Sequence, residues 1–191
     1  MLFERNYKNN IFLTVLCAVG AGFLTGCLYV GFFCGGRLSQ ICAVYKTSFE
    51  GSAQIVSTVA DVLFFTGSLF LLGLSLYGFW VCEIFVFAKA MTFGMLASAC
   101  YCLNGGKGAM IVATVILPYA FLILTVLCLF CTEATDLSYH VYRATDRKIL
   151  KSLIKRYCSV SAVLFAATAI PVLWRVYMVP LAMKYICSIF I

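Results

Sequence analysis

The sequence predicts an all-α, polytopic membrane protein that forms a single membrane domain over residues 1–191. Two observations predict this class. The chain is 64% hydrophobic and only 11% charged, whereas soluble domains average about 45–50% apolar and about 25% charged residues. Apolar stretches of about 18 residues or more also recur along the chain, and each is long enough to cross roughly 30 Å of hydrocarbon.

The apolar stretches divide into five expected transmembrane helices, at about 11–33, 62–77, 80–103, 109–131 and 159–179. The first is longer than the apolar region of a cleaved signal peptide, which is about 7–15 residues. The tract 62–103 is long enough for two passes, and the turn between them falls either at Gly78 or at Lys89. An outer loop over 35–60 and a cytoplasmic basic segment over 132–158 provide the long connections.

Charge placement favours five spans over four spans with a re-entrant loop. Six of the fourteen Lys and Arg residues lie between residues 143 and 156. With five spans and a cytoplasmic N-terminus, this cluster faces the cytoplasm, as the positive-inside rule requires, whereas four spans would place it outside. We therefore expect the N-terminus in the cytoplasm and the C-terminus outside.

Residues 137–157 have the pattern of a basic amphipathic helix between the fourth and fifth spans. Leu150, Leu153, Ile154 and Tyr157 share one face, and lysines and arginines lie opposite. Such a helix suits the inner leaflet of the membrane. Its basic side chains are expected to contact lipid headgroups and not nucleic acid; they are Arg143, Arg147, Lys148, Lys151, Lys155 and Arg156.

The sequence offers no combination of residues that predicts catalysis. His140 is the single histidine, and only seven acidic residues are present, so a nucleophile, a base and an orienting group are not available together. We expect neither a metal site nor a cofactor. Most of the eleven cysteines lie in apolar runs, where cysteine behaves as a small hydrophobic residue.

Glu83 and Lys89 are the intramembrane charges that this pattern singles out. With a turn at Gly78, Lys89 lies eleven residues further along, or roughly 16 Å into the bilayer. A charge there is costly and should face protein or a wet cavity. Glu83 is about 120° away around the helix, so the partner of Lys89 must come from another span or a second copy. With a turn nearer Lys89, its side chain would instead reach the headgroups.

Small residues at a spacing of four predict close helix packing. Gly22 and Gly26 follow Ala18 in the first span, and Gly94 lies between Ala90 and Ser98 in the third. Such stripes let helix backbones approach closely in lipid, either within one chain or in a homo-oligomer. Pro118 is expected to kink the fourth span and to free a backbone carbonyl.

Three stretches resemble the stage II sporulation protein M family. Residues 70–78, with Gly73 and Gly78, are similar to that family's glycine-punctuated second span. Residues 87–94, with Lys89 and Gly94, resemble its Phe-x-Lys-Gly-x-x-x-Gly stretch, although Ala90 replaces the usual glycine. Residues 105–108 and Pro118 resemble its short glycine loop and the opening of the next span, and Tyr119 stands where relatives carry a polar residue.

The resemblance implies a noncatalytic scaffold in the cell membrane of a spore-forming bacterium. Such a subunit anchors or recruits peptidoglycan hydrolases, stage II sporulation proteins D and P, to the septal membrane during engulfment. We expect Leu38, Ile41 and Tyr45 in the outer loop to form the docking element, because of their position and amphipathic spacing. The alternative is a small transporter or channel built around Lys89 and Glu83.

Overall fold

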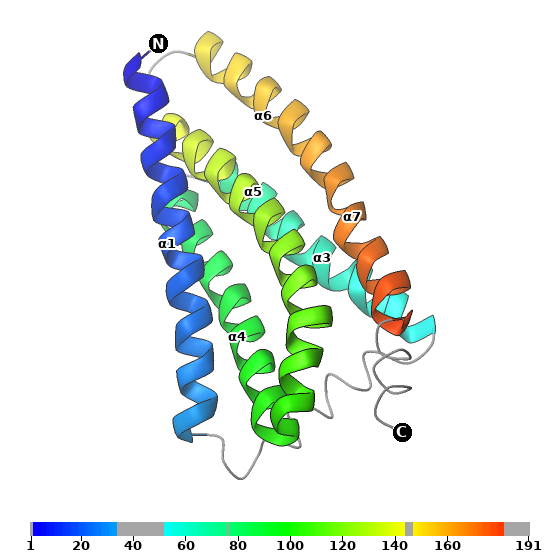
Figure 1. Cartoon of the computed structure of the whole chain (residues 1–191). Coiled ribbons are helices and arrows are strands. Elements are labelled where there is room, and N and C mark those ends of the chain that lie inside the picture. Colours follow the sequence, from blue (N-terminus) through cyan, green and yellow to red (C-terminus); the bar gives the residue numbers. More distant parts are fainter. Residues whose placement is uncertain (1, 34–51, 76, 144–146, 182–191) are drawn as a thin grey trace.

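The computed structural model describes residues 2–33, 52–75, 77–143 and 147–181, and these residues form helices without any β-strand. The all-α prediction is therefore confirmed for this part of the chain. The elements are α1 (Leu2–Phe33), α3 (Ser52–Gly73), α4 (Gly78–Ile111), η1 (Val112–Ile116), α5 (Leu117–Arg143), α6 (Arg147–Ala167), α7 (Ala169–Leu173) and η2 (Trp174–Met178). Figure 1 shows α1 alongside α4 on one side of the molecule and the α6–α7 arm on the other.

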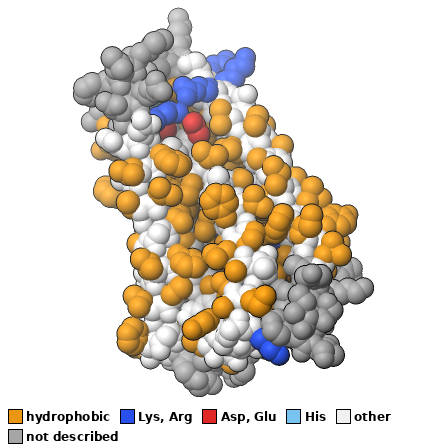
Figure 2. Space-filling view, in the orientation of Figure 1, with side chains coloured by type: hydrophobic (Ala, Val, Ile, Leu, Met, Phe, Trp, Pro, Cys, Tyr) orange, Lys and Arg blue, Asp and Glu red, His pale blue; other side chains and the backbone are white. Residues whose placement is uncertain are grey.

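Four helical segments among the described residues are long and apolar enough to cross a membrane. They are Lys8–Phe33, Ile55–Gly73, Gly78–Tyr142 and Leu150–Leu181. Large hydrophobic side chains are exposed along all four, and Figure 2 shows hydrophobic side chains spread over the middle of the face in view. An exposed apolar belt of this extent is typical of a protein surrounded by lipid.

The longest of these segments reverses direction at Gly105. Gly105 has a φ of 54°, a conformation that glycine adopts readily because it has no Cβ. Gly108 then lies against the backbone of Cys100 and Tyr101, and Figure 1 shows the helices before and after the reversal side by side. The short glycine loop therefore forms a tight helix–helix turn.

The turn between the second and third helices lies immediately before Gly78, which confirms the first of the two predicted positions. Ser138 of α5 holds this turn, since its Oγ donates to the carbonyl of Ser75 at 2.7 Å and accepts from the N–H of Phe79 at 3.0 Å. A Cβ at Gly78 would collide with the carbonyl of Leu72. Lys89 consequently lies eleven residues into α4.

Glycines allow α1 and α4 to pack closely within one chain. A Cβ at Gly22 or Gly26 would meet the carbonyl of Phe87 or Met91 of α4, and a Cβ at Gly94 would meet the carbonyl of Phe23 of α1. The predicted small-residue stripes therefore serve internal packing, as is usual where helix backbones approach in lipid. Gly73 has the same role against Tyr157 of α6.

The segment 137–157 is not one helix, which corrects the prediction of a separate helix on the inner leaflet. Its first part belongs to α5, which continues to Arg143, and its last part belongs to α6. Leu153, Ile154 and Tyr157 pack against the core of the bundle, and Lys151, Lys155 and Arg156 are exposed. The apolar face that the pattern revealed is therefore covered by protein.

The second helix begins earlier than predicted, because α3 begins at Ser52 and not near residue 62. Asp61 consequently lies nine residues inside a helix that is long and apolar enough to cross a membrane. This shift places inside the helix an acidic side chain that lay between the predicted loop 35–60 and the predicted span 62–77.

Candidate functional site

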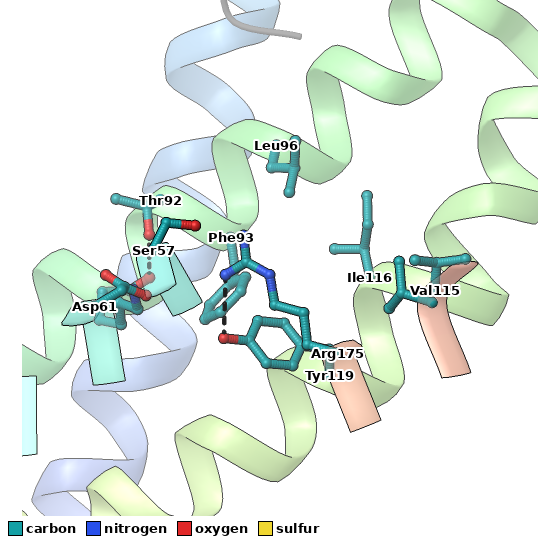
Figure 3. A pocket seen from close by; sticks show the side chains of 11 residues that line it. Ser57, Asp61, Thr92, Phe93, Leu96, Val115, Ile116, Tyr119 and Arg175 are labelled. Carbon is teal, nitrogen blue, oxygen red and sulfur yellow. Dashed lines mark hydrogen bonds and ion pairs between the residues drawn. The ribbon is translucent and has the colours of Figure 1, made fainter. Parts of the chain in front are cut away.

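The candidate site is a pocket of about 240 Å³ that is lined by residues of α3, α4, η1, α5 and η2 and by Val179 (Figure 3). Its apolar side chains are Phe93, Leu96, Val115, Ile116 and Val179, and its polar side chains are Ser57, Asp61, Lys89, Thr92, Tyr119 and Arg175. All of them belong to the four segments that could cross a membrane. Ionisable groups inside membrane-crossing helices are rare and are usually functional.

Lys89 and Asp61 form an ion pair at this pocket. The Lys89 ammonium donates to both carboxylate oxygens of Asp61, at 2.6 and 2.8 Å. The side chain of Lys89 is 9% exposed and that of Asp61 is 33% exposed, so the ammonium is buried while the carboxylate borders the cavity. Charge-assisted hydrogen bonds of this length are among the strong ones.

Aromatic rings complete the surroundings of the Lys89 ammonium. It lies 4.3 Å from the ring centroid of Phe65 and 5.6 Å from that of Phe93. The negative face of an aromatic ring attracts a cation within about 6 Å. The ammonium is thus stabilised by the carboxylate and the Phe65 ring of α3 and by the Phe93 ring of its own helix, α4.

Arg175 is the second cation of the pocket. It is 9% exposed, and its Nη1 donates to the Tyr119 hydroxyl at 3.5 Å. The guanidinium carbon lies 5.3 Å from the centroid of the Tyr119 ring, and Figure 3 shows the guanidinium joined to the Tyr119 hydroxyl by a dashed line. The described lining thus contains two basic side chains and one acidic side chain, a net charge of one positive unit.

Both π-helical segments of the described chain border this pocket. η1 contributes Val115 and Ile116, and η2 contributes Arg175. In each segment a residue donates to the carbonyl five positions earlier: Leu117 to Val112, and Val179 to Trp174. π-Helical turns are rare, and they occur frequently at functional sites.

A proline is the second residue after each π-helical segment, and it explains why the π-helical turn occurs at that point of the helix. Pro118 follows η1, and Pro180 follows η2. Because proline has no N–H and its ring clashes with the carbonyl four positions earlier, the ladder before it rearranges. The predicted disturbance at Pro118 therefore takes the form of a π-helical turn.

The structure separates the two intramembrane charges that the sequence singled out. Lys89 lines the pocket, whereas Glu83 does not; an oxygen of Glu83 accepts a hydrogen bond from Thr14 of α1 at 3.2 Å. The partner of Lys89 comes from another helix of the same chain, which was one of the two predicted possibilities. A site built around Lys89 and Glu83 together is therefore not what the structure contains.

Sequence reasoning missed Asp61 and Arg175. Asp61 lies between the predicted loop 35–60 and the predicted span 62–77, and only the start of α3 at Ser52 places it inside a helix. Arg175 had a signal, because an arginine inside the predicted span 159–179 is costly in lipid and therefore points to function. Tyr119 had been noted only as a departure from the resembling family.

A second cluster of charges joins α1 and α5 at the end of the bundle where α1 begins. Lys8 pairs with Glu133 at 2.9 Å and with Asp136 at 3.2 Å. The Nδ1 of His140 lies 2.7 Å from the carbonyl oxygen of Asp136, and the side chain of His140 is 36% exposed. This partly exposed network ties the helix ends together.

Several of the predicted positions lie outside the described residues. Leu38, Ile41 and Tyr45 lie outside them, and so do the side chains of Arg143, Arg147 and Lys148. Within the described ranges, no three His, Cys, Asp or Glu side chains are grouped as metal ligands. Comparisons of the chain with protein-family models, with curated proteins and with solved structures found no match.

Proposed function

We propose that the chain is a five-pass integral membrane protein of the bacterial cell membrane with a cytoplasmic N-terminus. The reversal at Gly105 divides the segment Gly78–Tyr142 into two antiparallel passes, which supports five passes in place of four. Lys8, Lys151, Lys155 and Arg156 belong to the helix ends that meet at one side, and Lys107 belongs to the opposite turn. The positive-inside rule assigns the first side to the cytoplasm.

Its proposed role is that of a noncatalytic scaffold of the stage II sporulation protein M type. It would anchor or recruit the peptidoglycan hydrolases D and P to the septal membrane during engulfment. One observation carries this proposal: the residues on which the resemblance rests are those that shape the bundle. Gly73, Gly78 and Gly94 sit at close helix contacts, and Gly105 forms the reversal.

This placement supports a common architecture more than a common chemistry. Glycines at close backbone contacts are needed for packing in lipid, whatever the protein binds. Lys89, the charged residue of the resembling stretch, is paired within the chain to Asp61. A protein built from such residues acts through the surfaces that it presents to partners.

The test is affinity purification of the tagged full-length chain from sporulating cells in a mild detergent. Near-stoichiometric recovery of the hydrolases is the expected result. The double variant Leu38→Asp/Ile41→Asp should lower that recovery at least fivefold, on the order of 1 kcal/mol, while membrane insertion stays unchanged. Lys107→Asp, on the proposed outer side, is the matched control and should retain the hydrolases.

The two failures have different meanings. Undiminished recovery with the double variant would contradict the docking element alone. A wild-type chain that purifies without hydrolases would contradict the scaffold.

The second candidate function is a small transporter or channel, and the charged pocket specifically favours it. The pocket uses Lys89 and Arg175, and Glu83 is not part of it. Proteoliposomes containing the purified chain should then pass a small anion such as chloride, and Lys89→Met should change the flux. Absence of flux in the wild-type protein would eliminate this candidate and leave the scaffold untouched.

A further inference from the structure

We propose that one flank of α1, next to Glu83, docks a transmembrane helix of another protein that carries a lysine or arginine near its cytoplasmic end. The residues of this flank are Thr14, Ala18, Ala21 and Thr25. The inference rests on the proposed scaffold function and deepens it, because it names a surface inside the membrane and the chemistry of the partner that this surface fits. It does not involve the pocket at Lys89.

Glu83 is a carboxylate inside a membrane-crossing segment, and no cation balances it within the described chain. It belongs to the segment Gly78–Tyr142, and among the residues that the structure describes no basic side chain forms an ion pair with it. Acidic groups inside membrane-crossing helices normally pair with another polar group. Asp61 does so, since it pairs with Lys89 of the next helix.

The hydrogen bond from Thr14 does not satisfy the Glu83 carboxylate. The Thr14 hydroxyl oxygen lies 3.2 Å from a carboxylate oxygen of Glu83 and 2.8 Å from the carbonyl oxygen of Ile11. A hydroxyl group has a single proton to donate, and the contact with Ile11 is the shorter of the two. The carboxylate therefore keeps the capacity to accept hydrogen bonds from a donor outside this chain.

The surroundings of Glu83 are apolar and lie below the charged end of the bundle. Thr14 is six residues beyond the ion-paired Lys8, or about 9 Å further along α1. Near this level, Leu16 of α1 and Ile84 of α4 are exposed. The hydrocarbon of a membrane offers no hydrogen-bond donor, so a donor for Glu83 must come from a polar group that another molecule brings to this depth.

The flank of α1 next to Glu83 has the small side chains that a close helix contact needs. Its four residues follow one another at intervals of four, three and four, so they lie along one face of the helix. Thr14, Ala21 and Thr25 are exposed, and Figure 1 shows α1 at the edge of the bundle. Small residues let helix backbones approach closely in lipid, as Gly22 and Gly26 do against α4 on the neighbouring face.

Charge complementarity selects the occupant. A second copy of the chain would have to bring a cation to this depth, but Lys89 and Arg175, the described cations within the membrane-crossing segments, are buried at the pocket. A lipid ammonium group lies in the headgroup layer, nearer the membrane surface than Glu83. A lysine or arginine on a partner helix brings its charge to the level of Glu83 and fixes the register of the contact.

The experiment uses designed single-pass helices as probes, produced in a bacterial host together with the affinity-tagged full-length chain. Each probe has about twenty leucine and alanine residues after a cytoplasmic fluorescent domain. One probe carries lysine at its sixth apolar position, and its twin carries methionine there. After purification in a mild detergent, the wild-type chain should retain the lysine probe about fivefold more than its twin, relative to the amount of each in the membrane, because charge-assisted hydrogen bonds are strong.

Variants assign this preference to Glu83. Glu83→Gln should abolish it, because the negative charge is lost. Glu133→Gln is the matched control and should leave it unchanged, since Glu133 is already paired with Lys8 and Lys8 keeps Asp136 at 3.2 Å. If Glu83→Gln does not fold, Ala21→Phe replaces it, because Ala21 is exposed and a ring there obstructs the close approach. Retention of the lysine probe should then fall severalfold.

Three results would overturn the proposal. Equal retention of both probes by the wild-type chain would show that the face does not select a cationic helix, as expected if a lipid headgroup occupied it. Undiminished preference in Glu83→Gln, or undiminished retention in Ala21→Phe where only that variant folds, would place the contact elsewhere. Two differently tagged copies that co-purify as wild type and not as Glu83→Gln would make the occupant a second copy.

These failures are distinguishable from a failure of the scaffold. The designed probes replace the natural partner, so a negative result with them contradicts this surface alone. A wild-type chain that retains the lysine probe and purifies without hydrolases would contradict the scaffold alone.

Discussion

Removal of Asp61 should cost far more stability than removal of the whole Asp61–Lys89 pair. In Asp61→Leu, the Lys89 ammonium, whose side chain is 9% exposed, loses both of its carboxylate contacts. Breaking a buried pair in this way typically costs about 3–5 kcal/mol, because an uncompensated charge is left behind. Lys89→Met leaves Asp61 alone, and since its side chain is 33% exposed, we expect a smaller loss of about 1–3 kcal/mol.

The double variant Asp61→Leu/Lys89→Met should recover most of the loss. Replacing both partners by apolar residues of similar volume is often neutral or stabilising, so the free energy of unfolding should lie within about 1 kcal/mol of the wild-type value. The resulting coupling energy is at least about 3 kcal/mol. That value is well above the average of about 0.6 kcal/mol for hydrogen bonds between transmembrane helices.

The assay is equilibrium unfolding of the chain in mixed micelles, followed by the helical circular dichroism signal. The three variants and the wild-type protein form one thermodynamic cycle. The losses of the two single variants could instead add up in the double variant, with a coupling energy below about 0.5 kcal/mol. That result would contradict the explanation that the unpaired charge causes the loss of stability in Asp61→Leu.

Three further substitutions test the packing of the bundle. Gly26→Ala should lose about 1–3 kcal/mol of unfolding free energy in the same assay, because its Cβ would collide with the backbone of Met91. Gly31 has open space around it, so Gly31→Ala should lose none. Equal losses in the two variants would contradict the α1–α4 contact. Gly105→Ala should lose about 1–2 kcal/mol of unfolding free energy because of the positive φ of residue 105. Gly106→Ala should lose none. An unchanged stability of Gly105→Ala would argue against the reversal at this residue. Tyr157→Phe should lose about 0.5–1.5 kcal/mol, since its hydroxyl donates to the carbonyls of Leu69 and Phe70, both at 3.3 Å; an unchanged stability would remove that contact from the account.

The features that the sequence predicted are those that depend on local pattern. Apolar length predicted helices that are long enough to cross a membrane, and Gly78 marked one of the two predicted positions of the turn between the second and third helices. The spacing of Gly22, Gly26 and Gly94 predicted close packing, because a stripe of small residues has the same consequence whichever helix lies against it. The partner helix itself was not readable from the stripe.

The features that escaped prediction depend on contacts between distant segments. The amphipathic pattern of 150–157 shows that one face avoids water, but it does not tell whether lipid or protein covers that face. The partner of Lys89 lies 28 positions away, on a helix whose start the polarity of residues 52–60 had concealed. The pocket required α3, α4, α5 and η2 to meet, which no local period encodes.

The most direct test of the central claim, a five-pass bundle that reverses at Gly105, is a set of alkaline phosphatase fusions made after residues 107, 143 and 181. This enzyme is active only outside the cytoplasm. Activity is expected after residue 107 and after residue 181, and none is expected after residue 143. Activity after residue 143 would place the α5–α6 connection outside and would contradict both the five passes and the cytoplasmic position of the basic end.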